Sequence, residues 1–354
     1  MNSAGYDIIV VGAGPAGSSA AEAAAREGMR VLVVERRSRI GQPVRCAEYI
    51  PGILLGEVSA GRGFVVQPVK GMKTFVSGRL AHESVAPGFM IHRDLFDLAL
   101  ADKARGAGAE IRTSTSAVGL EGGCLSVLGP SGKRETVEGR VIIGADGPHS
   151  RVGRWIGFEN TGLIPGIQLS ASLVEGLSCT EVHFSDEIHA GYGWVFPKGE
   201  EANVGLGMKP VHGGPSITGA LERFAAGQVA RGVIKPGFSG FTAGWIPAGP
   251  LGDFTSGNVY LAGDAAGHTH PITGAGVAQA VFGGRMAGTY AARGVISGDI
   301  EASGREYREE WRETFGESHD RACRRRLLLE ERWAEMENVI RRCWVAFREY
   351  YAGS

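Results

Sequence analysis

A glycine-rich turn close to the N-terminus constrains this chain more than any other feature. Asp7–Val11 is a short, mostly apolar run, Gly12, Gly14 and Gly17 follow it, and residues 18–26 are rich in alanine. This order predicts a strand, a tight turn and a helix, the start of a unit that binds a dinucleotide. The first glycine permits the turn, the second lets a pyrophosphate approach the backbone, and the third lets the helix pack closely. The helix N-terminus would then face the phosphates.

A second apolar run, residues 30–34, ends at Glu35. A carboxylate at this distance from the turn accepts hydrogen bonds from ribose hydroxyls and repels a 2′-phosphate. The alternative interpretation is a structural turn followed by an ordinary surface glutamate. The fit of the whole unit favours a bound dinucleotide.

Two later segments carry related patterns, GADGPHSR at 144–151 and VYLAGDAAG at 259–267. The second is an apolar run that delivers Asp264 just past a strand, where its carboxylate could accept a hydrogen bond from a ribityl chain. The sequence PITGAG at 271–276 then precedes a helix expected to begin near Val277. The N-terminal amides of that helix would face the flavin edge that becomes negative on reduction. Together with the first turn, these segments predict an FAD-binding fold.

Composition excludes several other classes of protein. The 354 residues have a formal net charge of −1, which gives no electrostatic footprint for nucleic acid. The five cysteines form no C-x-x-C pair, which argues against a disulfide framework or a zinc site. His268 and His270 lack companion ligands, so no metal is expected. We find no signal peptide and no run long enough to span a membrane. These patterns predict a cytoplasmic protein.

The flavin domain is expected to be interrupted. After a loop that follows Glu35, the residues up to about Gly88 are expected to be irregular, with alternating segments such as Gly63–Val69. A helix is predicted over 92–107, and a strand over 110–112. Short alternating runs over 165–250 indicate an antiparallel sheet. The predicted fold is α/β, with a Rossmann-type FAD-binding domain (three layers, mostly parallel sheet), an inserted antiparallel β-sheet substrate domain and a C-terminal helical tail. The expected boundaries are 1–50, 85–160 and 255–295 for the FAD-binding domain, 51–84 and 161–254 for the substrate domain, and 296–354 for the tail.

Two finer motifs lie within this layout. PVRCAE occupies 43–48, and YGWVFP at 192–197 precedes NVGLG at 203–207. Over about residues 5–290 the chain is similar to the flavoprotein monooxygenase superfamily of p-hydroxybenzoate hydroxylase type. The two motifs resemble those of the geranylgeranyl reductase family within it, namely a cysteine-bearing loop beside the flavin and an aromatic element lining a lipid pocket. Arg93 matches an arginine that the family places against FAD.

The patterns and this resemblance together predict three sets of residues. The cofactor-binding set is Gly12, Gly14, Pro15, Ala16, Gly17, Glu35, Arg36, Arg45, Cys46, Ala47, Arg93, Ala117, Val118, Asp146, Gly147, Gly263, Asp264, Pro271, Gly274, Gly276 and Val277. The substrate-binding set is Tyr192, Trp194, Phe196 and Pro197, and the catalytic set is Cys46, Tyr192 and Trp194.

The resemblance implies reduction of isolated double bonds in a prenyl lipid. Reduced flavin gives a hydride to one alkene carbon, and the other carbon must receive a proton. The thiol of Cys46 could relay this proton, and a water or Tyr192 could serve instead. The face of Trp194 could ease positive charge in the transition state. The simpler interpretations are a small buried cysteine and a strand with aromatic core residues.

Other assignments stay open at this point. No second dinucleotide turn is visible, so NAD(P)H would bind transiently, or a reduced ferredoxin-type carrier protein would supply electrons. A monooxygenase or halogenase would share the fold; a halogenase would show W-x-W-x-I-P and a reactive lysine, for which Lys70 and Lys73 are the candidates. A flavin-binding module without catalysis is a third alternative.

The tail carries an apolar stripe. Its members are Leu329, Trp333, Met336, Ile340, Trp344, Phe347 and Tyr351, at spacings that predict one helical face. Arginines surround the stripe. We expect it to dock onto the protein body and to cap a lipid tunnel, with peripheral membrane contact as the alternative.

Overall fold

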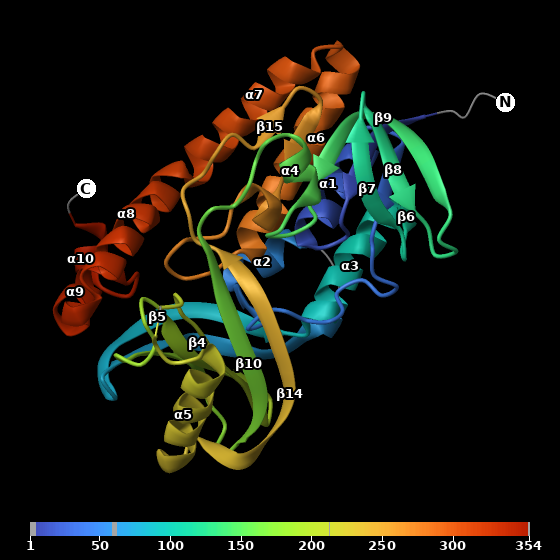
Figure 1. Ribbon diagram of the computed structural model, residues 1–354. Helices are drawn as coiled ribbons and strands as arrows, with labels where there is room; N and C mark the ends of the chain where they lie inside the picture. The colour runs from blue at the N-terminus through green and yellow to red at the C-terminus, as the bar shows by residue number, and fades with distance from the viewer. Residues whose placement is uncertain (1–4, 59–61, 212, 353–354) are drawn as a thin grey trace.

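The computed structural model describes residues 5–58, 62–211 and 213–352. Two eight-stranded sheets lie at opposite ends of the molecule, and a long helical arm runs from one to the other (Figure 1). The predicted α/β fold class is confirmed. Most of the β-branched runs of the sequence lie in the core of the first sheet.

The first sheet has a parallel centre. Its main path runs β15-β16-β9-β1-β2-β6, with β7 and β8 paired beside β9. The strands are β1 (Tyr6–Val11), β2 (Val31–Val34), β6 (Glu110–Arg112), β7 (Ser116–Glu121), β8 (Cys124–Leu128), β9 (Arg134–Gly144), β15 (Thr255–Ser256) and β16 (Val259–Leu261). Only β15 and the pairs made by β8 are antiparallel. This order brings the ends of β1 and β16 close together.

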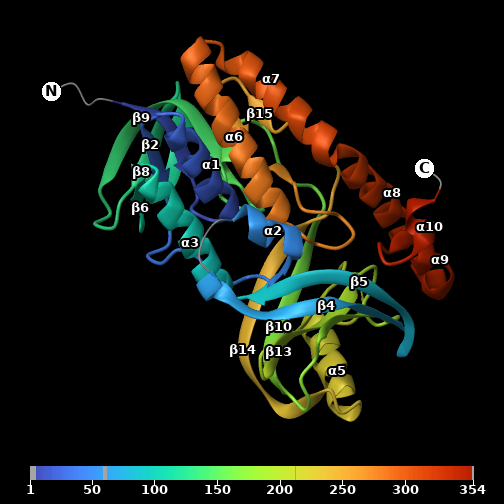
Figure 2. The ribbon, with the colours of Figure 1, turned by 180° about the vertical axis from the view of Figure 1, so that it is seen from behind.

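Helices α1 (Pro15–Arg26), α3 (Arg93–Gly106) and α6 (Val277–Ser297) cover one face of this sheet, as Figure 2 shows. Helices α1 and α6 approach each other through glycine. A Cβ on Gly284 would lie 2.2 Å from the carbonyl oxygen of Ala16, and one on Gly288 would lie 2.1 Å from that of Ala20. Since no side chain fits there, the two helices hold the glycine turn and the start of α6 in fixed relation.

The second sheet lies at the other end of the molecule, and its strands follow the order β14-β10-β13-β12-β11-β4-β5-β3. The strands are β3 (Tyr49–Pro51), β4 (Val65–Val76), β5 (Arg79–Ile91), β10 (Leu163–Leu173), β11 (Cys179–Phe184), β12 (Tyr192–Lys198), β13 (Glu201–Gly207) and β14 (Ile234–Pro247). Helix α5 (Ile217–Ala230) packs on its outer face. The expected antiparallel sheet is present, except that β11 pairs with β4 in parallel.

One expectation for this region was wrong. The sequence up to about Gly88 was predicted to be irregular, with alternation only in segments such as Gly63–Val69, whereas β4 and β5 form a long hairpin after the short helix α2 (Gly52–Glu57). Register shifts interrupt the hairpin, which explains why its alternation is hard to recognise. Residues 59–61, within this stretch, lie outside the described residues. The domain boundaries themselves stay a prediction.

The tail departs from the single helical face predicted for it. It consists of α7 (Ile300–Trp311), a π-helical turn (Arg312–Gly316), α8 (Glu317–Glu331), η4 (Trp333–Glu335), α9 (Met336–Cys343) and α10 (Arg348–Tyr351). The breaks around Arg332 and Trp344 shift the helical phase, so Tyr350 is buried while Tyr351 is 58% exposed.

Docking of the tail onto the protein body is confirmed. The other six members of the stripe are buried in one cluster with residues of the second sheet, including Val182 and Phe184. Burial of apolar surface thus sets the path of the tail, and helical periodicity follows it only within each segment. Among the described residues, no helix is long and apolar enough to cross a membrane.

Candidate active site

The glycine turn has the geometry that a pyrophosphate requires. Gly12 has φ +102°, and a Cβ there would lie 2.4 Å from the carbonyl oxygen of Ala145. A Cβ on Gly17 would lie 1.9 Å from the carbonyl oxygen of Gly12. Over Gly14, by contrast, a Cβ would meet no described atom within 4 Å. The open side of the turn, ahead of Pro15 at the start of α1, is therefore where an anion can approach.

Glu35 is fixed beside this turn at the end of β2. Its Oε2 accepts a hydrogen bond from Ala13 N at 2.9 Å, and its Oε1 accepts one from Arg37 N at 2.9 Å. Each carboxylate oxygen keeps a further lone pair for a ribose hydroxyl. The residues present thus fit the adenosine half of FAD. Arg36, also in the predicted set, is exposed beside Glu35.

Asp264 and the start of α6 form the second half of the site. Asp264 Oδ1 accepts a hydrogen bond from Thr269 Oγ1 at 2.7 Å, and a Cβ on Gly276 would lie 3.4 Å from the same oxygen. Burial raises the pKa of Asp264, and the hydrogen bond from Thr269 and the charge of Arg93 oppose that effect. A buried carboxylate beside the N-terminus of α6 fits a polyhydroxyl chain and a flavin edge. Gly263, Pro271, Gly274 and Val277 lie in the same segment.

The GADG segment forms a turn that its own aspartate stabilises. Both carboxylate oxygens of Asp146 accept hydrogen bonds from the first turn of α4 (Arg151–Trp155) and its N-cap, from Ser150 Oγ at 2.5 Å and Arg151 N at 2.7 Å. Arg151 in turn donates to the carbonyl oxygen of Ala117 at 3.1 Å. Asp146 therefore holds this turn together, and cofactor contact by Asp146, Gly147, Ala117 and Val118 stays a prediction.

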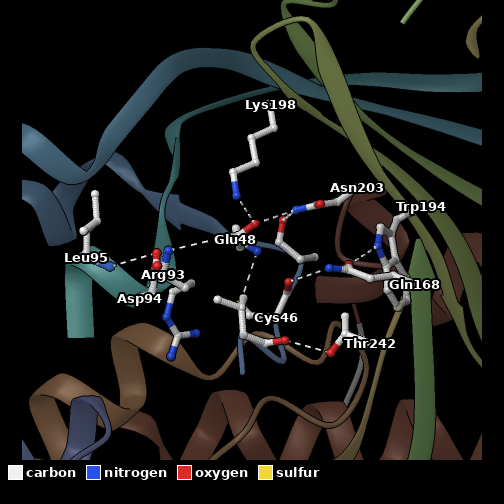
Figure 3. Close-up of polar contacts among 12 residues, drawn as sticks. Cys46, Glu48, Arg93, Asp94, Leu95, Gln168, Trp194, Lys198, Asn203 and Thr242 are labelled. Carbon is white, nitrogen blue, oxygen red and sulfur yellow. Dashed lines mark hydrogen bonds and ion pairs between the residues drawn. The ribbon is translucent and has the colours of Figure 1, made fainter. Parts of the chain in front are cut away.

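The loop that carries Cys46 crosses the inner face of the second sheet, and four neighbouring strands hold it (Figure 3). The contacts, from β14 to β12, are Thr242 Oγ1 to Val44 O at 2.7 Å, Gln168 Nε2 to Cys46 O at 2.9 Å, Asn203 Nδ2 to Ala47 O at 3.1 Å, and Lys198 Nζ to Glu48 Oε2 at 2.5 Å. Each partner lies more than 100 positions from its loop residue, so the loop conformation depends on the folded sheet. Arg45, in the same loop, is exposed.

Glu48 is the anchor of this loop, and sequence reasoning did not single it out. Its side chain is buried, and its carboxylate also accepts hydrogen bonds from Arg93 N and Asn203 Nδ2, each at 3.0 Å. Its φ of +69° is a left-handed conformation that costs a non-glycine residue about 1 kcal/mol or more. The only sequence signal was its place at the end of the PVRCAE motif.

The thiol of Cys46 lies between this anchor and a buried cation. Its Sγ accepts a hydrogen bond from Glu48 N at 3.2 Å. Burial would lower the pKa of Arg93, but the carboxylate of Asp97 and the nearby Cys46 raise it above its usual value. Arg93 Nε and Asp97 Oδ1 are 3.0 Å apart. The structure thus places the predicted residues Cys46 and Arg93 next to each other.

Tyr192, Trp194 and Phe196 alternate along β12 and share its inner face. The indole of Trp194 lies against Gly205, where a Cβ would be 2.5 Å from Trp194 Cζ2. Only glycine leaves room for the indole at position 205. This contact explains why NVGLG, the second part of the aromatic motif, carries a glycine at this distance from Trp194. Trp194 Nε1 donates to Gln168 Oε1 at 3.2 Å, which connects the wall to the Cys46 loop.

The other wall residues have defined partners as well. The hydroxyl of Tyr192 donates to the carbonyl oxygen of Thr273, and burial raises the pKa of Tyr192 above its ordinary value. The ring of Phe196 contacts Tyr49, with 6.3 Å between the ring centroids, and Pro197 is buried. Among the described residues, no group of three or more His, Cys, Asp or Glu side chains could hold a metal ion.

Known proteins are similar to this chain over most of its length. A family model described as FAD dependent oxidoreductase matches residues 7–42. A digeranylgeranylglycerophospholipid reductase of Methanocella arvoryzae is 38% identical over 341 residues, covering 89% of this chain and 85% of the relative. The protein of that name from Methanosarcina acetivorans is 36% identical, covering 97% and 86%. The chain belongs to the digeranylgeranylglycerophospholipid reductase family.

Solved structures agree with this assignment. A geranylgeranyl bacteriochlorophyll reductase-like protein from Thermoplasma acidophilum superposes with a TM-score of 0.84 at 30% identity, covering 92% of this chain and 87% of that one. A flavin-dependent brominase superposes with a TM-score of 0.75 at 19% identity, over 94% and 91%, which shows a shared fold alone. The predicted geranylgeranyl reductase resemblance and FAD-dependent oxidoreductase class are confirmed.

Proposed function

We propose that this protein saturates isolated C=C bonds of a digeranylgeranylglycerophospholipid or a related prenyl lipid. The observation that carries the proposal is the position of the Cys46 loop, which four strands hold and which Gln168 connects to Trp194 of the aromatic wall, in a chain of this family. An aromatic wall suits a methyl-branched chain, because it buries apolar surface with few polar demands. FAD, held by the glycine turn, Glu35 and Asp264, would supply the hydride once reduced.

The chain itself must supply a proton to the second alkene carbon. The hydroxyl of Tyr192 already donates to Thr273 O, and its raised pKa makes it a poor acid. Cys46 is half-buried, and its thiol lies beside Arg93 and carries a proton that it can donate. We therefore favour Cys46 as the proton donor. Trp194, whose Nε1 donates a hydrogen bond to Gln168, is part of the aromatic wall.

The source of electrons and the location of the protein are part of the same proposal. NAD(P)H bound transiently, or a reduced ferredoxin-type carrier, would reduce the flavin. The sequence carries no second dinucleotide fingerprint after a strand, which is consistent with either route, since the first one serves FAD. A prenyl lipid substrate is consistent with a cytoplasmic protein that makes peripheral contact with a membrane.

An anaerobic turnover experiment tests the reaction. Dithionite-reduced protein should convert a geranylgeranyl lipid to products that have gained two hydrogen atoms per double bond, while the flavin reoxidises. Cys46→Ser should slow this step by roughly 10²–10⁴-fold, the range for loss of a general acid. Cys124→Ser, on β8 of the first sheet, is the matched control.

Two outcomes would change the proposal. Equal turnover by Cys46→Ser and the unmodified protein would assign the acid to water or Tyr192. Products that gain an oxygen atom, and form only in air, would favour the monooxygenase alternative instead.

A further inference from the structure

A cluster of charged side chains lies between α8 and the second sheet, outside the site described above. Arg326 and Glu330 are one turn apart on α8, with Arg326 Nε 2.7 Å from Glu330 Oε1. Lys209, just after β13, contacts the other carboxylate oxygen of Glu330. Lys209 and Arg326 both contribute to lowering the pKa of His189, after the larger effect of burial, so this imidazole faces the same group. Lys209 and Arg326 thus share the carboxylate of Glu330, so these three side chains together carry a net positive charge.

Arg326 has an unused donor. The residue is only 6% exposed, and its Nη2 is buried with no hydrogen-bond partner among the described residues. Trp333 Nε1, in the short η4 turn that follows α8, is buried and without a hydrogen-bond partner among the described residues as well. Burial lowers the pKa of Arg326, and Glu330 opposes that effect, but an arginine stays protonated at neutral pH. Since buried polar groups are almost always paired, Arg326 Nη2 is a donor that an incoming acceptor would satisfy.

The cluster connects solvent with the aromatic wall. Side-chain exposure falls from 50% at Lys209 to 19% at Glu330 and 8% at Arg326. At the inner end, the guanidinium of Arg326 lies close enough to Tyr192 to oppose the rise in its pKa. Apolar residues of the tail, among them Leu329, are buried in one cluster that Tyr192 packs against. A ligand with a charged end at Lys209 and Arg326 could therefore extend an apolar chain past Tyr192.

We propose that Arg326 and Lys209 bind the phosphate of the lipid head group, so that the prenyl chain enters the site beside Tyr192. This inference rests on the proposed function, and it adds a recognition site for a phosphate ester. Guanidinium groups bind phosphate through short charge-assisted hydrogen bonds, and Arg326 Nη2 is free to make one. Both carboxylate oxygens of Glu330 already accept hydrogen bonds from Lys209 and Arg326. The groups that an incoming phosphate meets first are therefore the donors of these two cations.

Two ligands that differ only in the phosphate test this proposal. Geranylgeranyl monophosphate and geranylgeraniol are titrated into the oxidised, FAD-loaded protein by calorimetry. The monophosphate should bind roughly 10- to 100-fold more tightly than the alcohol, the range for hydrogen bonds to a charged group. Arg326→Gln should remove this preference and leave the affinity for the alcohol unchanged. Arg341→Gln, at an exposed arginine paired with Glu349, is the matched control and should keep the preference.

Lys209→Gln provides a second variant at a half-exposed position, in case Arg326→Gln fails to fold. It should lower the preference for the monophosphate by a smaller factor. Equal binding of the two ligands by the unmodified protein would overturn the proposal. A loss of affinity for both ligands in Arg326→Gln would also overturn it, and would make the cluster a structural tie between α8 and the sheet.

Turnover with the same two lipids separates this proposal from the reductase assignment. Reduction of both lipids without preference for the phosphate would support the reductase and reject the head-group site. Preferential binding of the monophosphate, without reduction of either lipid, would support the site and reject the reductase.

Discussion

Lys198 Nζ lies 2.5 Å from Glu48 Oε2, and this ion pair joins β12 of the second sheet to the loop that holds Cys46. The two residues are 150 positions apart, and their side chains are 20% and 4% exposed. The pair links the proposed proton donor to the aromatic wall that would hold the substrate. Its removal should therefore affect stability and turnover together.

Lys198→Met should destabilise the protein by about 3 kcal/mol, because a buried carboxylate would lose its cation. Asn203 and Arg93 N would still donate to Glu48, which limits the loss. Urea unfolding measures the difference. Arg105→Met is the control, since the exposed pair of Arg105 and Asp102 should contribute less than about 1 kcal/mol. Similar losses for both variants would show that Glu48 does not depend on Lys198.

Glu35→Ala should weaken FAD retention by roughly 1–3 kcal/mol, the range for leaving hydrogen-bonding groups unpaired. Two backbone amides, those of Ala13 and Arg37, lose their acceptor as well. Equilibrium dialysis against FAD checks the affinity. Glu27→Ala, at an exposed position after α1, should retain FAD normally. Undiminished affinity in Glu35→Ala would refute a ribose contact.

Gly205→Ala should destabilise the protein by about 1–3 kcal/mol, since the added methyl would overlap the indole of Trp194. Displacement of the ring should break its hydrogen bond to Gln168 and shift the tryptophan emission. Gly227→Ala is the control, because a Cβ there meets no described atom within 4 Å and alanine favours the α5 helix. Unchanged stability and emission in Gly205→Ala would show that the wall tolerates a side chain there.

Trp344→Ala should cost about 3–5 kcal/mol of stability, the range for removing a buried indole. Trp344 is 2% exposed, its ring centroid lies 5.1 Å from those of Phe184 and Tyr192, and its Nε1 donates to Thr74 Oγ1 at 3.1 Å. Tyr351→Ala should change stability little, because Tyr351 is 58% exposed. Thermal unfolding distinguishes the packed tail described here from a continuous helix, in which both residues would face the body.

The protein should lose stability as the pH falls from 7.5 to 5. Burial lowers the pKa of His270 to about 4, from 6.5, with His319 adding to the effect. Between these values the unfolded chain binds a proton that the folded chain does not, so acid favours unfolding, by about 2 kcal/mol at pH 5. Urea unfolding at several pH values measures the slope. His270→Gln should flatten it, and an identical slope in that variant would assign the effect to other groups.

Local patterns were sufficient to predict the cofactor half of the molecule. The glycine turn, the carboxylate of Glu35 at the end of β2 and the start of α6 at Val277 all lie where the sequence placed them. Each depends on the backbone conformation of adjacent residues, which glycine and β-branched residues restrict directly. The alternation of Tyr192, Trp194 and Phe196 puts the three side chains on one face of β12, because successive side chains of a strand point to opposite faces.

Only the tertiary structure determined which residues complete the site. Gln168, Lys198 and Asn203 reach the Cys46 loop because neighbouring strands of one sheet carry them, and no local pattern records a contact across 122 to 156 positions. The tail shows the same limit, since its apolar stripe predicted burial but not the breaks that turn Trp344 inward and Tyr351 outward. Periodicity describes one helix in isolation, whereas burial depends on the surface against which the helix packs.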